Sequence, residues 1–276
     1  MALPKKINII TGAIFYLVRK SQILKFKIFK KLFSYFYFFL KQKLECPYYS
    51  VDFANRYYYL FQNGNIIDAG AHFGYLSKYF CRALTNNFKV YSFEPTAFNF
   101  EFLLDIASDK KYKDKIIAQN TALSAKKGKG ILTENYSVPT ESKITKILND
   151  KIENIKLSKN QKIVEIISID DFANTLETKK IKFIKVDTEG EELQILKGAV
   201  NTIKNNPDIT IALEYKFTFN DNGDFIKDAI LEFVNEYFKN IYVLTKKTKL
   251  IKIDEISKIR KIKFSAELIC TNYELN

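Results

Sequence analysis

Short apolar segments of strand length alternate with segments of helical spacing through most of the chain. Five apolar runs of strand length occur at 65–69, 89–93, 115–119, 183–186 and 209–213, and several of them are rich in Ile or Val and bounded by turn residues. Helical spacing occurs at 75–84, 98–107, 191–203 and 225–238. Repeated strand, helix and strand units with nearly continuous apolar strands predict an α/β fold. We expect a mostly parallel central sheet with helices on both faces.

Two other regions depart from this alternation. Three short runs near the C-terminus, at 241–244, 250–253 and 267–271, are expected to close the sheet, some of them antiparallel. The polar, Lys- and Asn-rich stretch at 124–162 is interpreted as an insertion over the sheet edge, partly a hairpin. Because no Gly/Ser-rich or Pro-rich linker interrupts the chain, we expect one domain over residues 46–276. A basic, amphipathic helical segment over residues 1–45 would precede it as an N-terminal extension.

The net charge of +13 is concentrated at the N-terminal end. Residues 1–44 hold ten Lys or Arg and no acid, which leaves 34 basic and 31 acidic residues, or only +3, for the rest of the chain. Between Phe26 and Lys41, aromatic and aliphatic residues share one helical face and lysines share the other. This pattern is typical of an interfacial membrane helix.

Three partners are possible for this basic helix. Its apolar face could pack on the domain, or residues 20–43 could bind an anionic membrane surface. Nucleic acid is the least favoured partner, because the body of the protein is nearly neutral and the aromatic residues are segregated from the basic face. The first apolar run, 7–18, lacks a cleavage site and is too short to span a bilayer. We therefore expect a cytoplasmic protein that could lie peripherally on the inner membrane face.

Cysteine and histidine usage excludes several kinds of site. Cys46, Cys81 and Cys270 are widely spaced and odd in number, so neither a disulfide framework nor a zinc site is indicated. A single histidine excludes sites that need two, such as HExxH. No metal site is predicted.

The first predicted strand ends in an acid, which a glycine-containing turn and a helix follow in the sequence IIDAGAHFGYLS, from Ile66 to Ser77. This order places Asp68 at the carboxyl edge of the sheet, where α/β proteins bind nucleotides. Gly70 would let backbone approach a ligand, and Gly74 would relieve packing at the helix start. The spacing is DxGxxxG, not GxGxxG, and an acid here would repel a pyrophosphate but could hold a cationic amino group.

The second strand also ends in an acid, Glu94, 26 residues after Asp68. A carboxylate at the tip of a neighbouring strand can accept hydrogen bonds from both hydroxyls of a ribose. Together the two acids suit a ligand with a ribose and an ammonium group, and S-adenosylmethionine has both. For each acid alone, a cap on a turn or a helix is an equally good interpretation.

A third strand delivers Asp187 to the same edge, in the segment FIKVDTEGEELQILKGA. Asp187 and Glu189 are expected to face the pocket. For Glu191 and Glu192, favourable interaction of acids with the helix N-terminus is the preferred interpretation. Glu214, at the end of the next strand, would complete a semicircle of carboxylates.

These motifs together resemble the FkbM family of S-adenosylmethionine-dependent methyltransferases. The resemblance rests on IIDAGAHFGYLS, VYSFEP, NTALS, ISIDDF and FIKVDTEGEELQILKGA, which occur in the family's order over roughly residues 66–213. Its most specific part is DTEGEE with the following LKGA. Residues 1–60 lie outside the resemblance.

The resemblance implies a Rossmann-like class I methyltransferase fold with S-adenosyl-L-methionine as cofactor. The cofactor-binding residues that it implies are Asp68, Gly70, Ala71, His72, Gly74, Glu94, Asn120, Ala122, Leu123 and Asp187. The residues at the glycine turn would face the methionine part, Glu94 would bind the ribose hydroxyls, and residues 120–123 would lie near the adenine. At His72 the family more commonly has Asn, and both side chains can form hydrogen bonds.

Methyl transfer requires the donor and the acceptor to be aligned within about 3 to 3.5 Å. A general base acting on a hydroxyl acceptor would add a factor on the order of 10² to 10⁴. The candidate catalytic residues are Asp187 and Glu189, which match the family's DxEG acids, and His72, because a histidine titrates near neutral pH. Alternatively, His72 only hydrogen-bonds the cofactor or the turn.

We therefore expect a methyltransferase that acts on a hydroxyl of a glycan or a small-molecule acceptor, as the family mostly does. Two alternatives stay open from the sequence. One is a protein that binds RNA through its basic N-terminal segment, and the other is a membrane-associated, non-catalytic module that binds the cofactor.

Overall fold

A computed structural model describes residues 51–85, 87–134, 142–148, 155–215, 221–245, 248–260 and 266–275. The predicted basic segment at 1–45 and its predicted membrane contact at 20–43 lie outside these residues, so both stay predictions. Within the described part, no helix combines the length and the apolar character that crossing a bilayer requires.

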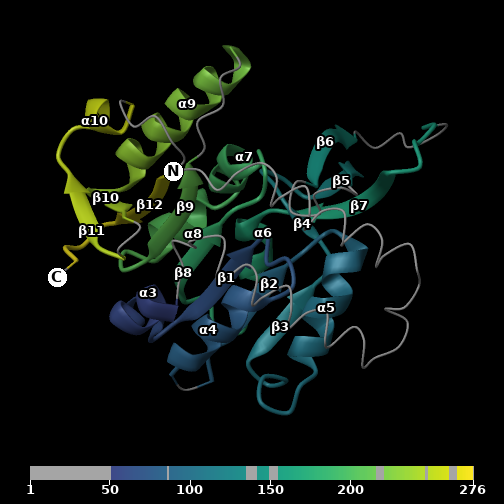
Figure 1. Cartoon of the computed structure of the whole chain (residues 1–276), viewed down its shortest axis with the longest axis horizontal. Helices are drawn as coiled ribbons and strands as arrows, with labels where there is room; N and C mark the ends of the chain where they lie inside the picture. Colours follow the sequence, from purple (N-terminus) through teal and green to yellow (C-terminus); the bar gives the residue numbers. More distant parts are fainter. Residues whose placement is uncertain are drawn as a thin grey trace, which may run out of the picture.

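An eight-stranded mixed sheet forms the centre of the described fold, in the order β11-β10-β12-β9-β8-β1-β2-β3 (Figure 1). Its parallel strands are β1 (Asn65–Ala69), β2 (Val90–Phe93), β3 (Ile116–Gln119), β8 (Ile181–Val186) and β9 (Thr210–Tyr215). Antiparallel pairing adds β12 (Ala266–Thr271), β10 (Asn240–Leu244) and β11 (Leu250–Ile253) beyond β9. The predicted α/β class, the five parallel strands and the antiparallel C-terminal strands are confirmed.

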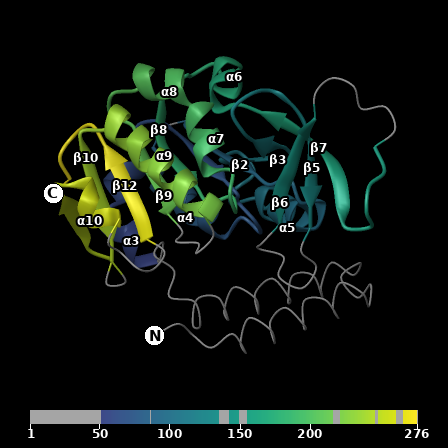
Figure 2. The same ribbon diagram turned by 90° about the horizontal axis from the view of Figure 1, so that it is seen from above.

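Helices cover both faces of this sheet, as predicted (Figure 2). One face carries α3 (Val51–Arg56), the short η2 (Tyr58–Phe61), α4 (Tyr75–Ala83) and α5 (Ala97–Ala107). The other carries α6 (Ile169–Asn174), α7 (Glu192–Lys197), α8 (Val200–Asn205) and α9 (Asp221–Tyr237). A further short helix, α10 (Ile256–Arg260), follows β11. The sequence pattern did not predict α3, α6 or α10.

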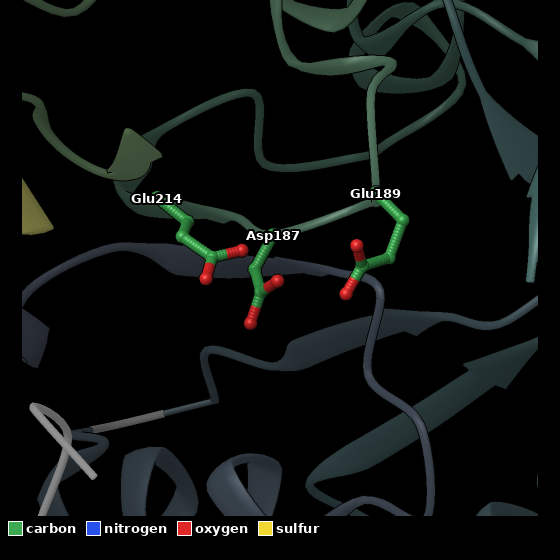
Figure 3. A group of neighbouring side chains, drawn as sticks. All are labelled: Asp187, Glu189 and Glu214. Carbon is green, nitrogen blue, oxygen red and sulfur yellow. The ribbon is translucent and has the colours of Figure 1, made fainter. Parts of the chain in front are cut away.

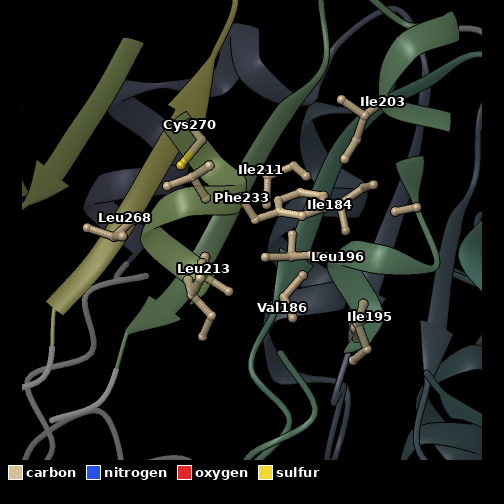
Figure 4. Close-up of a cluster of buried hydrophobic side chains, with 14 of the residues drawn as sticks. Ile184, Val186, Ile195, Leu196, Ile203, Ile211, Leu213, Phe233, Leu268 and Cys270 are labelled. Atoms are coloured by element: carbon tan, nitrogen blue, oxygen red, sulfur yellow. The ribbon is translucent and has the colours of Figure 1, made fainter. Parts of the chain in front are cut away.

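The alternation of side chains along β8 shows how the sheet separates the two cores. Ile184 and Val186 enter the core under α7, α8 and α9, where they meet Leu196 and Phe233 (Figure 4). Phe183 points to the opposite core, under α3 and α4. All six residues of β8 are buried, including Lys185. A lysine in a fully buried strand needs a charged partner, and this one lies at the end of the sheet where the predicted site is.

The stretch predicted as an insertion contributes to a second sheet, in the order β4-β7-β5-β6. Its strands are β4 (Ala122–Leu123), β5 (Gly128–Thr133), β6 (Lys143–Leu148) and β7 (Gln161–Ile167). The antiparallel pair β5 and β6 is consistent with the predicted partial hairpin, whereas β4 and β7 were not foreseen. Residues 135–141 and 149–154 of this stretch lie outside the described ranges, and the domain boundary near residue 46 stays a prediction.

The prediction of one helix over 191–203 is wrong, because the chain forms α7 and α8 with a break at Gly198. A Cβ at Gly198 would lie 2.4 Å from the carbonyl oxygen of Ser124. The carboxylate of Asp170 accepts hydrogen bonds from the backbone N–H groups of Asn201 (3.0 Å) and Thr202 (2.7 Å) and so starts a new helix. The IDDF and LKGA motifs are therefore structural partners that hold α6 against α8.

Candidate active site

The order of the strands reverses between β1 and β8. From β1 the chain continues outward to β2 and β3, and from β8 it continues outward to β9 on the other side. Ligands of open α/β sheets bind in the crevice at the carboxyl ends of the strands at such a point. The four predicted acids lie at these ends: Asp68 within β1, Glu94 after β2, Asp187 after β8 and Glu214 within β9.

Asp68 is fully buried and is held by side chains of the protein. Its Oδ2 accepts a hydrogen bond of 2.6 Å from the hydroxyl of Ser77, which in turn accepts one of 2.9 Å from Ser92. Its Oδ1 lies 3.6 Å from Nζ of Lys185. Burial raises the pKa of the Asp68 carboxyl, although Lys185 and Ser77 oppose this effect. The cation beside Asp68 is thus Lys185, a residue of the same sheet. The predicted contact of Asp68 with the ammonium group of a ligand stays a prediction.

Lys185 connects Asp68 to Asp187 and to the glycine turn. Its ammonium group lies 3.4 Å from Oδ2 of Asp187 and donates a hydrogen bond of 3.2 Å to the carbonyl of Gly70. Burial alone would lower the pKa of this lysine, but Asp187 and Asp68 outweigh burial and raise it. Lys185 therefore stays charged at the centre of the site. Sequence reasoning missed this residue, although a lysine within the apolar run IKFIKV was a usable signal.

The two glycines of the turn have positive φ angles, +76° for Gly70 and +78° for Gly74. A Cβ at Gly70 would lie 1.9 Å from the carbonyl oxygen of Asp187, and a Cβ at Gly74 would lie 2.7 Å from Cδ1 of Leu103. The packing role predicted for Gly74 is thus confirmed. At Gly70, the close approach is that of the Asp187 backbone, which brings the ends of β1 and β8 together.

Glu94 forms a second centre of hydrogen bonds beside the turn. Its Oε2 accepts from the backbone N–H of His72 at 2.9 Å. Its Oε1 accepts from the backbone N–H of Thr96 at 2.9 Å and from Nδ2 of Asn99 at 3.3 Å. Burial raises the pKa of the Glu94 carboxyl, and these hydrogen bonds oppose the rise. Glu94 therefore orders both the glycine turn and the start of α5.

Among the remaining predicted cofactor residues, His72 and Asn120 contact this centre directly. His72 has a φ of 51°, and its ring stacks on Phe73 with the centroids 4.1 Å apart. Nδ2 of Asn120 donates a hydrogen bond of 2.8 Å to the Glu94 carbonyl. Three other predicted residues are buried, and they are Ala71 at the turn and Ala122 and Leu123 in β4. Their predicted contacts with a cofactor stay predictions.

Asp187, Glu189 and Glu214 form a cluster of partly exposed carboxylates (Figure 3). One oxygen of each lies within 4.8 Å of those of the other two, which confirms the predicted semicircle for these three acids. Such a group could hold a metal ion, but partly exposed acidic clusters are common without one, and we assign no metal role to it. His72 does not belong to this cluster, so the three candidate catalytic residues do not meet in one group.

The turn that carries Asp187 and Glu189 is fixed by Glu192. Glu192 is buried, and its Oε1 accepts hydrogen bonds from the backbone N–H groups of Thr188 and Gly190, both at 3.1 Å. Glu189 has a φ of 55°, a left-handed conformation that is costly for a residue with a side chain. Glu192 thus stabilises a strained turn through specific hydrogen bonds, beyond the electrostatic effect on the helix end that the sequence suggested.

A family model described as the methyltransferase FkbM domain matches residues 68–243. The chain belongs to the FkbM methyltransferase family. The match begins at Asp68 and contains both centres of hydrogen bonds and the acidic cluster. No curated protein matches the sequence.

Several solved structures are similar to this FkbM-family chain at low sequence identity. The methyltransferase FkbM from Methylobacillus flagellatus KT is 16% identical, with a TM-score of 0.47 over 75% of this chain and 43% of that one, so this chain spans less than half its length. A precorrin-6y C5,15-methyltransferase from Geobacter metallireducens is 12% identical, with a TM-score of 0.39 over 77% and 82%. A protein from Streptococcus mutans in complex with SAH is 12% identical, with a TM-score of 0.42 over 78% and 94%.

Substitution of Gly70 by Ala is expected to lower the free energy of unfolding by more than about 2 kcal/mol. The new Cβ would combine a positive φ with a clash against the Asp187 carbonyl, so the ends of β1 and β8 must separate. Gly128→Ala is the matched control, because nothing lies within 4 Å of a Cβ there, and its effect should stay within about 0.5 kcal/mol. Equal urea midpoints for the two variants would contradict the close approach.

Substitution of Lys185 by Met is expected to cost about 3 to 5 kcal/mol in unfolding free energy, because it leaves the buried Asp68 without its cation. Lys129→Met removes the exposed pair of Lys129 with Glu165 and should cost less than about 1 kcal/mol. Adding Asp68→Asn to Lys185→Met should restore part of the loss in chemical denaturation. If the two lysine variants are equally mild, Lys185 does not stabilise the site.

Proposed function

We propose that this protein is an S-adenosylmethionine-dependent methyltransferase whose acceptor is a hydroxyl of a glycan or a small metabolite. The observation that carries the proposal is the FkbM match over residues 68–243, because the residues of its glycine turn, Glu94 and its DTEG acids converge on one strand-order reversal. The hydroxyl acceptor follows from the family resemblance, since FkbM enzymes mostly methylate hydroxyls, often on sugars.

The residues at this edge fit the cofactor in their chemistry. The carboxylate of Glu94 accepts from the backbone and the side chain of Thr96, from the backbone of His72 and from Asn99. Each carboxylate oxygen has about two lone-pair positions, and Oε2, which accepts from His72, is the oxygen that we propose for a ribose hydroxyl. Asp187, Glu189 and Glu214 supply negative charge at the side where a sulfonium group would need it.

When bound, the cofactor supplies a methyl group activated by its sulfonium sulfur. The protein's own contribution is to hold the acceptor in line and to exclude competing geometries. Asp187 is the proposed general base, because its side chain is 38% exposed and it belongs to both the acidic cluster and the Lys185 centre. Nζ of Lys185 lies 3.4 Å from Oδ2 of Asp187 and holds this carboxylate at the edge of the site. Glu192 and Lys185 position this base.

Asp187→Asn should still bind the cofactor measurably but lose turnover by a factor on the order of 10² to 10⁴ at saturating cofactor, because an amide cannot take the acceptor's proton. Calorimetric titration with S-adenosylmethionine measures binding. Turnover is measured by mass spectrometry, with a labelled methyl donor and a native extract of glycans and metabolites. Asp105→Asn on the exposed side of α5 is the control. A variant that binds cofactor and keeps full turnover would remove Asp187 as the base, and a wild type that binds no cofactor would defeat the enzyme proposal.

We also propose that residues 20–43 attach the enzyme to an anionic membrane surface, on the inner face of the membrane. Each Lys near an anionic leaflet contributes about 1 kcal/mol, so the four lysines of the polar face provide roughly 4 kcal/mol, and insertion of the aromatic face must add the rest. Full-length protein should float with anionic liposomes and lose this at high salt. A truncated protein that begins at Glu45, with its fold checked by circular dichroism, should not float. Equal flotation of the two proteins would contradict the proposed membrane attachment.

A further inference from the structure

Asn99, in the first turn of α5, has a buried carbonyl oxygen that accepts no hydrogen bond from any described residue. The side chain is only 2% exposed. Its Nδ2 donates a hydrogen bond of 3.3 Å to Oε1 of Glu94, which fixes the orientation of the amide. Turning the amide over would place its oxygen against the carboxylate oxygen, with two acceptors facing each other. The carbonyl oxygen of Asn99 is therefore held in place without a donor, an arrangement that is costly in a protein interior.

Glu94 alone has too little acceptor capacity for two ligand hydroxyls. Its Oε1 already accepts from the backbone of Thr96 and from Asn99, and its Oε2 accepts from the backbone of His72. The side chain of Thr96 also donates to this carboxylate, so of its about four lone-pair positions no more than about one is left, on Oε2. A vicinal diol brings two O–H donors that lie side by side. The second donor needs another acceptor beside Glu94. The amide of Asn99 donates to this carboxylate through its nitrogen, so its oxygen lies close by and can be that acceptor.

We propose that Asn99 is a cofactor-binding residue that shares recognition of the ribose diol with Glu94. Oδ1 of Asn99 accepts one hydroxyl and Oε2 of Glu94 accepts the other. The inference rests on the proposed function and revises the expectation that Glu94 binds both hydroxyls. It also gives Asn99 a second task, since its Nδ2 holds the carboxylate of Glu94 in the orientation that leaves Oε2 available.

The test combines variants of the protein with variants of the ligand. Wild type, Asn99→Leu and the control Asn205→Leu are titrated by calorimetry with S-adenosylhomocysteine and with its 2′-deoxy and 3′-deoxy analogues. Asn205 is an exposed asparagine at the end of α8, so the control makes the same chemical change away from the site. Asn99→Leu should weaken binding of S-adenosylhomocysteine about three- to tenfold, the effect of one hydrogen bond. The affinity of Asn99→Leu should then be the same with and without one of the two hydroxyls, and it should still fall when the other hydroxyl is removed.

Each other outcome overturns a defined part of the inference. Binding of S-adenosylhomocysteine by Asn99→Leu as tight as by wild type, or an equal loss for all three ligands, would show that Asn99 reads no hydroxyl, while the proposed function would stand. A wild type that binds none of the ligands would defeat the proposed function and this inference together. Circular dichroism and thermal unfolding check the fold of each variant, and Asn99→Ser, which also shortens the side chain away from the ligand, replaces Asn99→Leu if the latter does not fold.

Discussion

The buried ammonium group of Lys185 is the interaction on which the geometry of the site depends. It faces the carboxylates of Asp68 and Asp187 and the carbonyl of Gly70, three groups that would otherwise repel one another. Burying a lysine is costly, and only close acids and a hydrogen bond offset that cost. These partners come from β1, the glycine turn and the end of β8. One cation therefore joins the two strands between which the strand order reverses. The second centre, at Glu94, then adds β2 and α5 to the same framework.

The central sheet could be predicted from the sequence because its strands are apolar, short and bounded by turn residues, and because parallel strands place their terminal acids at one edge. Asp68, Glu94, Asp187 and Glu214 were found in this way. The second sheet was only partly foreseen, since β4 and β7 gain their identity from pairing with distant strands. The break between α7 and α8 was missed because it depends on Ser124, which approaches Gly198 only in the folded chain.

Within the site, sequence reasoning found acids better than it found their partners. Ser77, Lys185 and Asn99 act through contacts with residues 9, 117 and 5 positions away, respectively. Lys185 stood out as a charge in an apolar strand, whereas nothing in the local pattern distinguishes Asn99 from an ordinary helical residue. The role of Glu192 was hidden behind a simpler explanation, because an acid at a helix start has a favourable interaction with the helix end in any case.

Because the strand order reverses, the site is also built from two separate segments of the sequence. The centre at Glu94 is built from residues 68–99 and the acidic cluster from residues 187–214, with the second sheet encoded between them. None of the residues proposed to hold the methyl donor belongs to β5 or β6. Selection for a new acceptor can therefore act on these two strands while those residues are preserved.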